Sequence, residues 1–155
     1  SYQEMVPPSK IYTDEMAKMS VKYIKEKKPV LGAFIFDNPD HVGHDAGHDT
    51  PAYYANLKEL DGYIGQIIQA TKDAGIYENC IFIVTSDHGG IDHGHGGKTL
   101  EEINTPFIIA GKGVKKGGEF QASMMQFDCA PTVLEIFGLE GPQVWVGRSM
   151  SQVFE

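Results

Sequence analysis

The fold is decided by a stretch that begins PVLGAFIFD, residues Pro29 to Asp37. Its continuous apolar run, Val30 to Phe36, predicts a strand that is buried on both faces. A second apolar run, Cys80 to Thr85, predicts another buried strand. Between them, apolar residues at helical spacing predict a helix that Pro51 opens and Gly75 ends. A crossover of this length predicts that the two strands pair in parallel.

Further elements flank this strand–helix–strand unit. We expect a helix capped by Thr13 that ends in the lysine run Lys25 to Lys28, a short helix near Thr99 to Ile103, and a strand at Pro106 to Ala110. Asp128 is expected to cap a last helix. This alternation predicts an α/β fold with a mostly parallel sheet sandwiched between helices.

Size and charge limit the possible functions. The chain has 155 residues, of which 41% are hydrophobic, and this is enough for a core; no linker divides it, so we expect one domain from 1 to 155. The formal net charge is -8, so no basic field attracts nucleic acid. No apolar stretch is long enough to cross a bilayer. The sequence carries no signal for oligomeric state.

All six histidines fall in one third of the chain. They are interspersed with aspartates, in two clusters that each follow an apolar run: His41, His44 and His48, then His88, His93 and His95. In an open parallel sheet, the loops at the carboxyl ends of the strands form the ligand crevice. Imidazole and carboxylate together suit zinc, and also manganese or iron. The sequence therefore predicts a metal site on these two loops.

The two clusters carry recognisable motifs. They resemble the alkaline phosphatase superfamily, and most closely its type I phosphodiesterase and nucleotide pyrophosphatase group. The resemblance rests on three motifs in order: Asp40-x-x-Gly43-His44-x-x-Gly47, Thr85-Ser86-Asp87-His88-Gly89, and Gly94-His95-Gly96.

This resemblance implies a metal-dependent phosphoester hydrolase with two divalent ions, preferably zinc and alternatively manganese. Asp40, His44 and His95 would hold one ion, and Asp87 with His88 would help to hold the other. His93 is the alternative to His95, because both lie in a His-Gly-His sequence. Two ions about 3.5 to 4 Å apart stabilise the attacking and leaving oxygens of an in-line displacement. The implied partner is a small phosphoester, and the implied location is outside the cytoplasm.

One departure from the family pattern limits the prediction. The family places a further metal-binding aspartate and its Ser or Thr nucleophile before the stretch that begins at Pro29, and nothing in Ser1 to Lys28 resembles that segment. We therefore expect this chain to be the carboxyl-terminal part of such a catalytic domain, a partial domain that supplies metal ligands, contains no catalytic nucleophile and is inactive alone.

Three alternatives stay open. The motif around Asp40 and His44 also resembles the cofactor-independent phosphoglycerate mutases and phosphopentomutases, which transfer phosphate. Sulfatases share the Ser86 to Gly89 motif, although their metal site is richer in acids and amides. The third alternative is that the isolated chain is a non-catalytic metal-binding domain.

Overall fold

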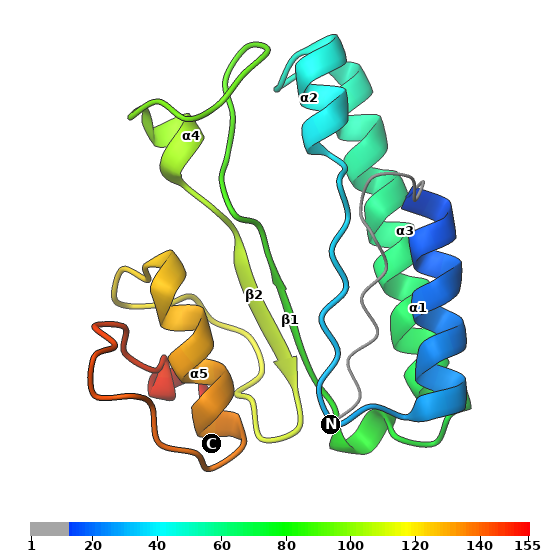
Figure 1. Ribbon diagram of the computed structural model, residues 1–155, viewed down its shortest axis with the longest axis vertical. Helices are drawn as coiled ribbons and strands as arrows, with labels where there is room; N and C mark the ends of the chain where they lie inside the picture. The colour runs from blue at the N-terminus through cyan, green and yellow to red at the C-terminus, as the bar shows by residue number, and fades with distance from the viewer. Residues whose placement is uncertain (1–12) are drawn as a thin grey trace. The chain divides into compact units, whose positions relative to one another are not determined.

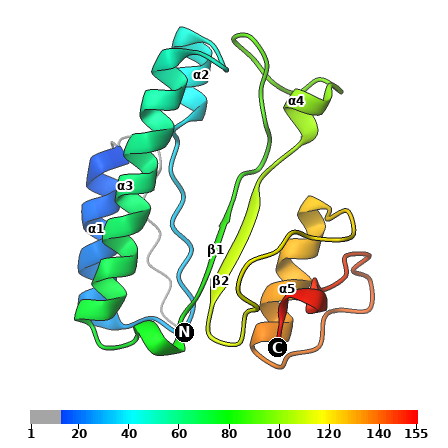
Figure 2. The same ribbon diagram turned by 180° about the vertical axis from the view of Figure 1, so that it is seen from behind.

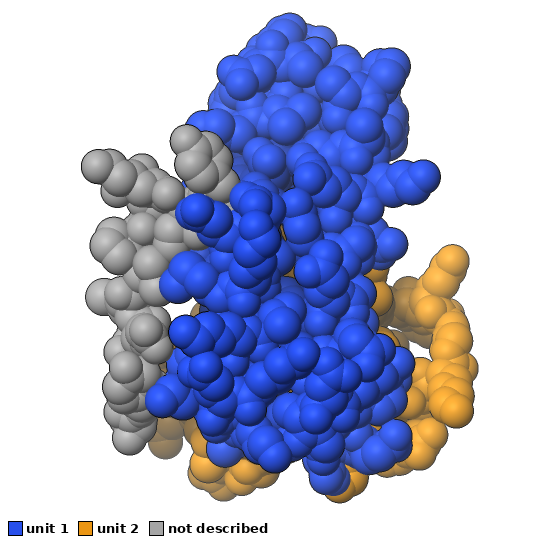
Figure 3. Space-filling view, turned by 90° about the vertical axis from the view of Figure 1, so that its right-hand side faces the viewer, with its two compact units in different colours: residues 1–80, 88–104 blue, residues 81–87, 105–155 orange. Residues whose placement is uncertain are grey.

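The computed structural model describes residues 13–155, which form two compact units (Figure 3). Within the described residues, unit 1 comprises residues 13–80 and 88–104, and unit 2 comprises residues 81–87 and 105–155. The predicted single domain also includes residues 1–12, which lie outside the described residues. Both histidine clusters belong to unit 1.

Unit 1 is built on two long helices that lie side by side, as Figures 1 and 2 show from opposite directions. Helix α1 spans Thr13–Lys27 and buries Ala17, Ser20 and Ile24, which recur at helical spacing on one face. Its acidic residues lie in the first turn and its lysines in the last, as the helix dipole favours. The predicted first helix is confirmed.

Helix α3 spans Pro51–Asp73, and it opens at the proline predicted from the sequence. The Thr50 hydroxyl accepts a hydrogen bond from the Tyr53 N–H at 3.3 Å, and Pro51 occupies the first turn. At the far end of α3, Oδ2 of Asp73 forms an ion pair with Nζ of Lys25 on α1, at a distance of 2.6 Å. None of the described helices combines the length and the apolarity needed to cross a bilayer.

Unit 2 contains the two strands of the described sheet and a helix. Strand β1, Ile81–Thr85, pairs with β2, Phe107–Gly111, in an antiparallel register that joins Ile81 to Gly111 and Thr85 to Phe107. Both predicted strands are therefore confirmed within about one residue. Helix α5 spans Cys129–Ile136, and short 3₁₀ helices lie at Tyr77–Asn79 in unit 1 and at Gln126–Asp128 and Ser151–Val153 in unit 2.

The predicted strand at Val30 to Phe36 does not form. This segment is extended and leads from α1 to α2 in Figure 1, but it belongs to no sheet among the described residues. Val30, Leu31 and Ile35 are 87%, 65% and 77% exposed. The expected parallel pair with residues 80–85 is therefore wrong for the described residues. An apolar run specifies a preference for extended backbone and burial, but it specifies neither a hydrogen-bonding neighbour nor its direction.

Asp128 precedes α5 but does not cap it with its side chain. Its buried carboxylate instead accepts the backbone N–H groups of Met125 at 2.8 Å and Arg148 at 2.9 Å. Thr132 continues this connection, because its buried hydroxyl donates to the Asp128 carbonyl and accepts the Met150 N–H. The side chain of Asp128 therefore does not cap α5 as predicted. Together with Thr132, it attaches the closing segment, which contains Arg148 and Met150, to α5.

Candidate metal centre

Helix α2 places two of the predicted ligands on one face. It spans Asp40–Ala46, so Asp40 and His44 are one turn apart, and His44 Nε2 lies 3.5 Å from Asp40 Oδ2. Gly47 follows the helix with a φ of +92°, a backbone conformation that favours glycine, and its N–H donates to the Gly43 carbonyl at 2.9 Å. The motif expected on a loop therefore lies on a short helix.

His95 joins this pair from a segment more than forty residues further along the chain. Its Nε2 lies 3.1 Å from His44 Nε2 and 3.4 Å from Asp40 Oδ1. The ligand atoms of the three residues all lie within 4.8 Å of one another. Both imidazoles are partly exposed, so the site is accessible from solvent. One carboxylate and two imidazoles are a donor set that suits zinc.

The Asp40 carboxylate has an unusual environment. Its Oδ1 atom is buried and makes no hydrogen bond with the described residues, although a buried carboxylate oxygen is normally paired. The Nε2 of His95 lies 3.4 Å from this oxygen but makes no hydrogen bond with it. A cation between Asp40, His44 and His95 would satisfy this oxygen, so the residues present fit a divalent metal.

Backbone contacts orient the imidazole of His44. Its Nδ1 lies 2.8 Å from the His93 carbonyl, and the Nδ1 of His93 lies 3.0 Å from the His44 carbonyl. Because a carbonyl oxygen only accepts, Nδ1 of His44 carries the hydrogen, and in the neutral ring Nε2 keeps its lone pair. This is the arrangement by which outer contacts orient metal-binding histidines.

The other predicted residues are placed differently. His93 contacts the backbone of His44 but is not part of the three-residue cluster, so the structure brings His95 and not His93 to Asp40. His88 stacks on His95 with ring centroids 3.7 Å apart, and its Nδ1 lies 2.8 Å from the Gly89 carbonyl. Asp87 belongs to unit 2, so the predicted second pair of ligands, Asp87 and His88, stays a prediction.

Two residues of unit 1 that the sequence analysis gave no role support the site. The nearly buried carboxylate of Glu102, on helix α4 (Leu100–Ile103), accepts the Gly97 N–H at 2.7 Å and the Thr99 hydroxyl at 2.8 Å. It thereby holds the segment that follows His95. The Thr-x-x-Glu spacing of a capping box is the sequence signal that identifies it. The other residue, His48, lies just after α2 and outside the motifs that identify the ligands.

Local electrostatics follow from these contacts. The hydrogen bonds from Thr99 and Gly97 lower the pKa of the Glu102 carboxyl, and the nearby His95 adds a smaller effect in the same direction. Partial burial, followed by the negative charge of Asp40, raises the pKa of the Tyr53 phenol. Tyr53 therefore stays neutral at neutral pH and adds no second negative charge beside Asp40.

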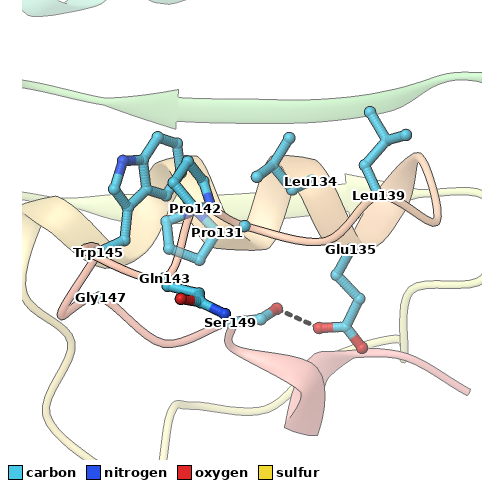
Figure 4. A pocket seen from close by; sticks show the side chains of 10 residues that line it. Pro131, Leu134, Glu135, Leu139, Pro142, Gln143, Trp145, Gly147 and Ser149 are labelled. Atoms are coloured by element: carbon cyan, nitrogen blue, oxygen red, sulfur yellow. Dashed lines mark hydrogen bonds between the residues drawn. The ribbon is translucent and has the colours of Figure 1, made fainter.

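Unit 2 contains a pocket of about 360 Å³ with a different character (Figure 4). Its lining includes Leu134, Leu139 and Trp145, and its only carboxylate, Glu135, already accepts hydrogen bonds from Ser149 and Ser151. Because no second titratable group lines it, the pocket offers neither a metal site nor an acid–base pair. All six histidines of the chain lie in unit 1.

The chain is similar in sequence to proteins of known families. The chain is 34% identical over 119 residues to a 2,3-bisphosphoglycerate-independent phosphoglycerate mutase of Cereibacter sphaeroides, covering 74% of this chain and 22% of the mutase. It is 33% identical over 79 residues to human ectonucleotide pyrophosphatase/phosphodiesterase family member 5, covering 50% of this chain and 16% of that protein. The chain thus spans about a fifth of the length of these relatives.

A solved structure shows the fold. A protein of Bacteroides thetaiotaomicron, provisionally described as a sulfatase, superimposes with a TM-score of 0.69 and 16% identity, covering 99% of this chain and 49% of that one. The predicted alkaline phosphatase-like α/β fold is therefore confirmed. Residues 8–127 match the family model described as type I phosphodiesterase / nucleotide pyrophosphatase. The chain belongs to the type I phosphodiesterase/nucleotide pyrophosphatase family, within the alkaline phosphatase superfamily.

Proposed function

We propose that this chain supplies metal ligands to a metal-dependent phosphoester hydrolase of the phosphodiesterase/nucleotide pyrophosphatase type. The observation that supports this most directly is the convergence of Asp40, His44 and His95 around a buried carboxylate oxygen that has no hydrogen-bond partner among the described residues. Zinc is the preferred ion for this donor set, and manganese is the alternative. Such an ion, when bound, polarises phosphoryl oxygens and activates water.

Each residue has a distinct part in the proposal. Asp40 supplies negative charge, and α2 fixes it one turn from His44. The carbonyl of His93 holds the hydrogen of His44 on Nδ1, which leaves Nε2 for the metal. Asp87 and His88 are proposed for a second ion, on the resemblance of their motif alone. The metal ions held by these residues would in turn bind a small phosphoester, in a site that is open to solvent.

The activity of the complete protein is also a proposal. We expect this chain alone to bind up to one ion tightly and to hydrolyse phosphoesters no faster than background, since the nucleophile is expected in another segment of a larger catalytic domain. Hydrolysis of bis(p-nitrophenyl) phosphate by the chain tests this. Turnover that disappears in Ser86→Ala alone would show that the nucleophile lies here. An extracytoplasmic location remains part of the proposal.

Metal content tests the site itself. The chain is purified without chelator, and zinc and manganese are counted per chain in the parent and in His44→Ala and His95→Ala. About one ion in the parent, lost in both variants, supports the proposal. His41→Ala is the matched control, because His41 is exposed on the same helix and lies outside the cluster. A parent without metal, or retention of metal in both ligand variants, contradicts the site.

Phosphotransfer is a second candidate, favoured by the similarity to the phosphoglycerate mutase. The two reactions differ in the acceptor of the phosphoryl group, which is water in hydrolysis and a second hydroxyl in transfer. Phosphorus NMR of the complete protein with a phosphomonoester and an added alcohol distinguishes them. Inorganic phosphate as the sole product favours the hydrolase, whereas a new ester favours the transferase.

A further inference from the structure

His48 occupies a slot between two glycine backbones of unit 1. A Cβ atom added at Gly43, on α2, would lie 2.3 Å from His48 Nε2, and one added at Gly90 would lie 2.2 Å from the same atom. Both distances are far below van der Waals contact, so the ring fits only because neither position has a side chain. The Nε2 edge of His48 thus touches the helix that carries Asp40 and His44 and also the segment that leads to His95.

The other edge of His48 contacts the backbone of Asp92. The ring Nδ1 of His48 lies 3.1 Å from the Asp92 carbonyl oxygen, and the backbone N–H of His48 donates to the same oxygen at 2.6 Å. Asp92 has a φ of +48° and lies in the turn closed by the bridge between Ile91 and Gly94. His48 therefore makes two contacts with this turn, in addition to the contact at Gly90.

This turn determines two features of the metal cluster. Its His93 carbonyl holds the Nδ1 of His44, and its end leads directly to His95. Loss of the His48 ring would leave the turn joined to α2 through the His48 backbone N–H and the contacts between His44 and His93, so the imidazoles of His44 and His95 would be held less firmly. His48 is itself unsuited to be a ligand, because its Nε2 faces the two glycine backbones and its Nδ1 faces a carbonyl.

We propose that His48 is a positioning residue for the Asp40, His44 and His95 site, and that its ring, inserted between Gly43 and Gly90, sets the affinity of that site for a divalent cation. The inference rests on the proposed metal-binding function. Substitution of outer residues that orient metal ligands costs about 10- to 100-fold in affinity. We expect His48→Ala to weaken Zn²⁺ binding within this range while all three ligands remain.

A double-mutant cycle with Gly90→Ala separates positioning from general destabilisation. The new methyl group displaces the ring of His48, so Gly90→Ala alone weakens Zn²⁺ binding, whereas adding it to His48→Ala brings little further loss, because the slot is then empty. Zn²⁺ affinity is measured by competition with a chromogenic chelator. The visible spectrum of the Co²⁺-loaded chain is expected to change in His48→Ala and to stay as in the parent in His41→Ala.

The outcomes are distinct. Parent-like Zn²⁺ affinity in His48→Ala, or losses that simply add in the double variant, overturn the positioning role even if His44→Ala and His95→Ala abolish binding. Binding that survives His44→Ala and His95→Ala instead overturns the proposed metal site. Circular dichroism of the metal-free variants monitors folding. If His48→Ala does not fold, Gly90→Ala, which keeps the histidine, decides the question: parent-like affinity overturns the role and weakened affinity supports it.

Discussion

At the scale of single residues, the carboxylate of Asp40 has opposite effects on folding and on metal binding. Its buried Oδ1 has no hydrogen-bond partner among the described residues, so in the metal-free fold this oxygen carries a desolvation cost that no hydrogen bond offsets. With a cation present, the same unpaired oxygen becomes a ligand. Functional sites commonly contain groups that stability alone would not select.

Asp40→Asn tests this conflict. The amide keeps the shape of the side chain and removes its charge, so the metal-free variant is expected to unfold at the same urea concentration as the parent or a higher one. Its Zn²⁺ affinity is expected to fall by more than the ~100-fold that marks the upper range for outer residues. Urea unfolding with chelator and a Zn²⁺ titration measure the two quantities. A less stable metal-free protein with unchanged affinity would assign Asp40 a structural role instead.

The residue scale also shows where sequence reasoning reaches its limit. Three of the residues predicted as ligands converge in the structure, because Asp40 and His44 are one helical turn apart and glycines flank His95. His48 was placed in the first histidine cluster but was given no role, since it lies outside the motifs that identify the ligands. Its different environment depends on the contact with Gly90, more than forty positions away, which no local pattern encodes.

At the scale of elements, the short helix α4 anchors the segment that follows His95. Glu102 receives hydrogen bonds from the Gly97 and Thr99 N–H groups and from the Thr99 hydroxyl. These bonds lower the pKa of Glu102 below its ordinary value of 4.5. A carboxyl whose pKa is lowered by folding stabilises the fold above its unfolded pKa, and this contribution is lost as pH falls through the folded pKa.

Glu102→Gln is therefore expected to be less stable than the parent at neutral pH, and the difference should shrink below about pH 4.5 and vanish under more acidic conditions. Thermal unfolding with chelator, recorded across this pH range for both proteins, measures it. Glu101→Gln, at an exposed neighbouring position, is the control and should match the parent throughout. A gap between parent and Glu102→Gln that is the same at every pH would show that charge is not involved.

Elements were predicted well where their signals are local. Helix α3 has its cap, its opening proline and its apolar spacing within the segment itself, and it forms between the expected ends. The run from Val30 to Phe36 has an equally clear composition, but a strand also needs a neighbour, and the described residues provide none. Helix α2 was missed because its seven residues include Gly43 and carry too few apolar positions to show a period.

At the scale of the whole molecule, the described chain separates into two units with different chemistry. Asp40, His44 and His95 lie in unit 1, whereas unit 2 is held by the buried contacts of Asp128 and Thr132 with the closing segment. A ligand stabilises only those openings that release it. Metal binding at the cluster should therefore act on unit 1 and leave local openings within α5 unchanged.

Hydrogen exchange followed by mass spectrometry measures this difference directly. With free Zn²⁺ at 100 times its dissociation constant, openings that release the ion cost about 2.7 kcal/mol more, so exchange through them slows by about 100-fold. We expect this slowing at residues 40–48 and 91–97, and no change at Cys129–Ile136 of α5. His95→Ala should remove the effect in unit 1. Equal slowing in both units, or slowing that persists in His95→Ala, would mean that zinc binds elsewhere or acts through the whole chain, and the assignment of the metal to α2 and the His95 segment would then be wrong.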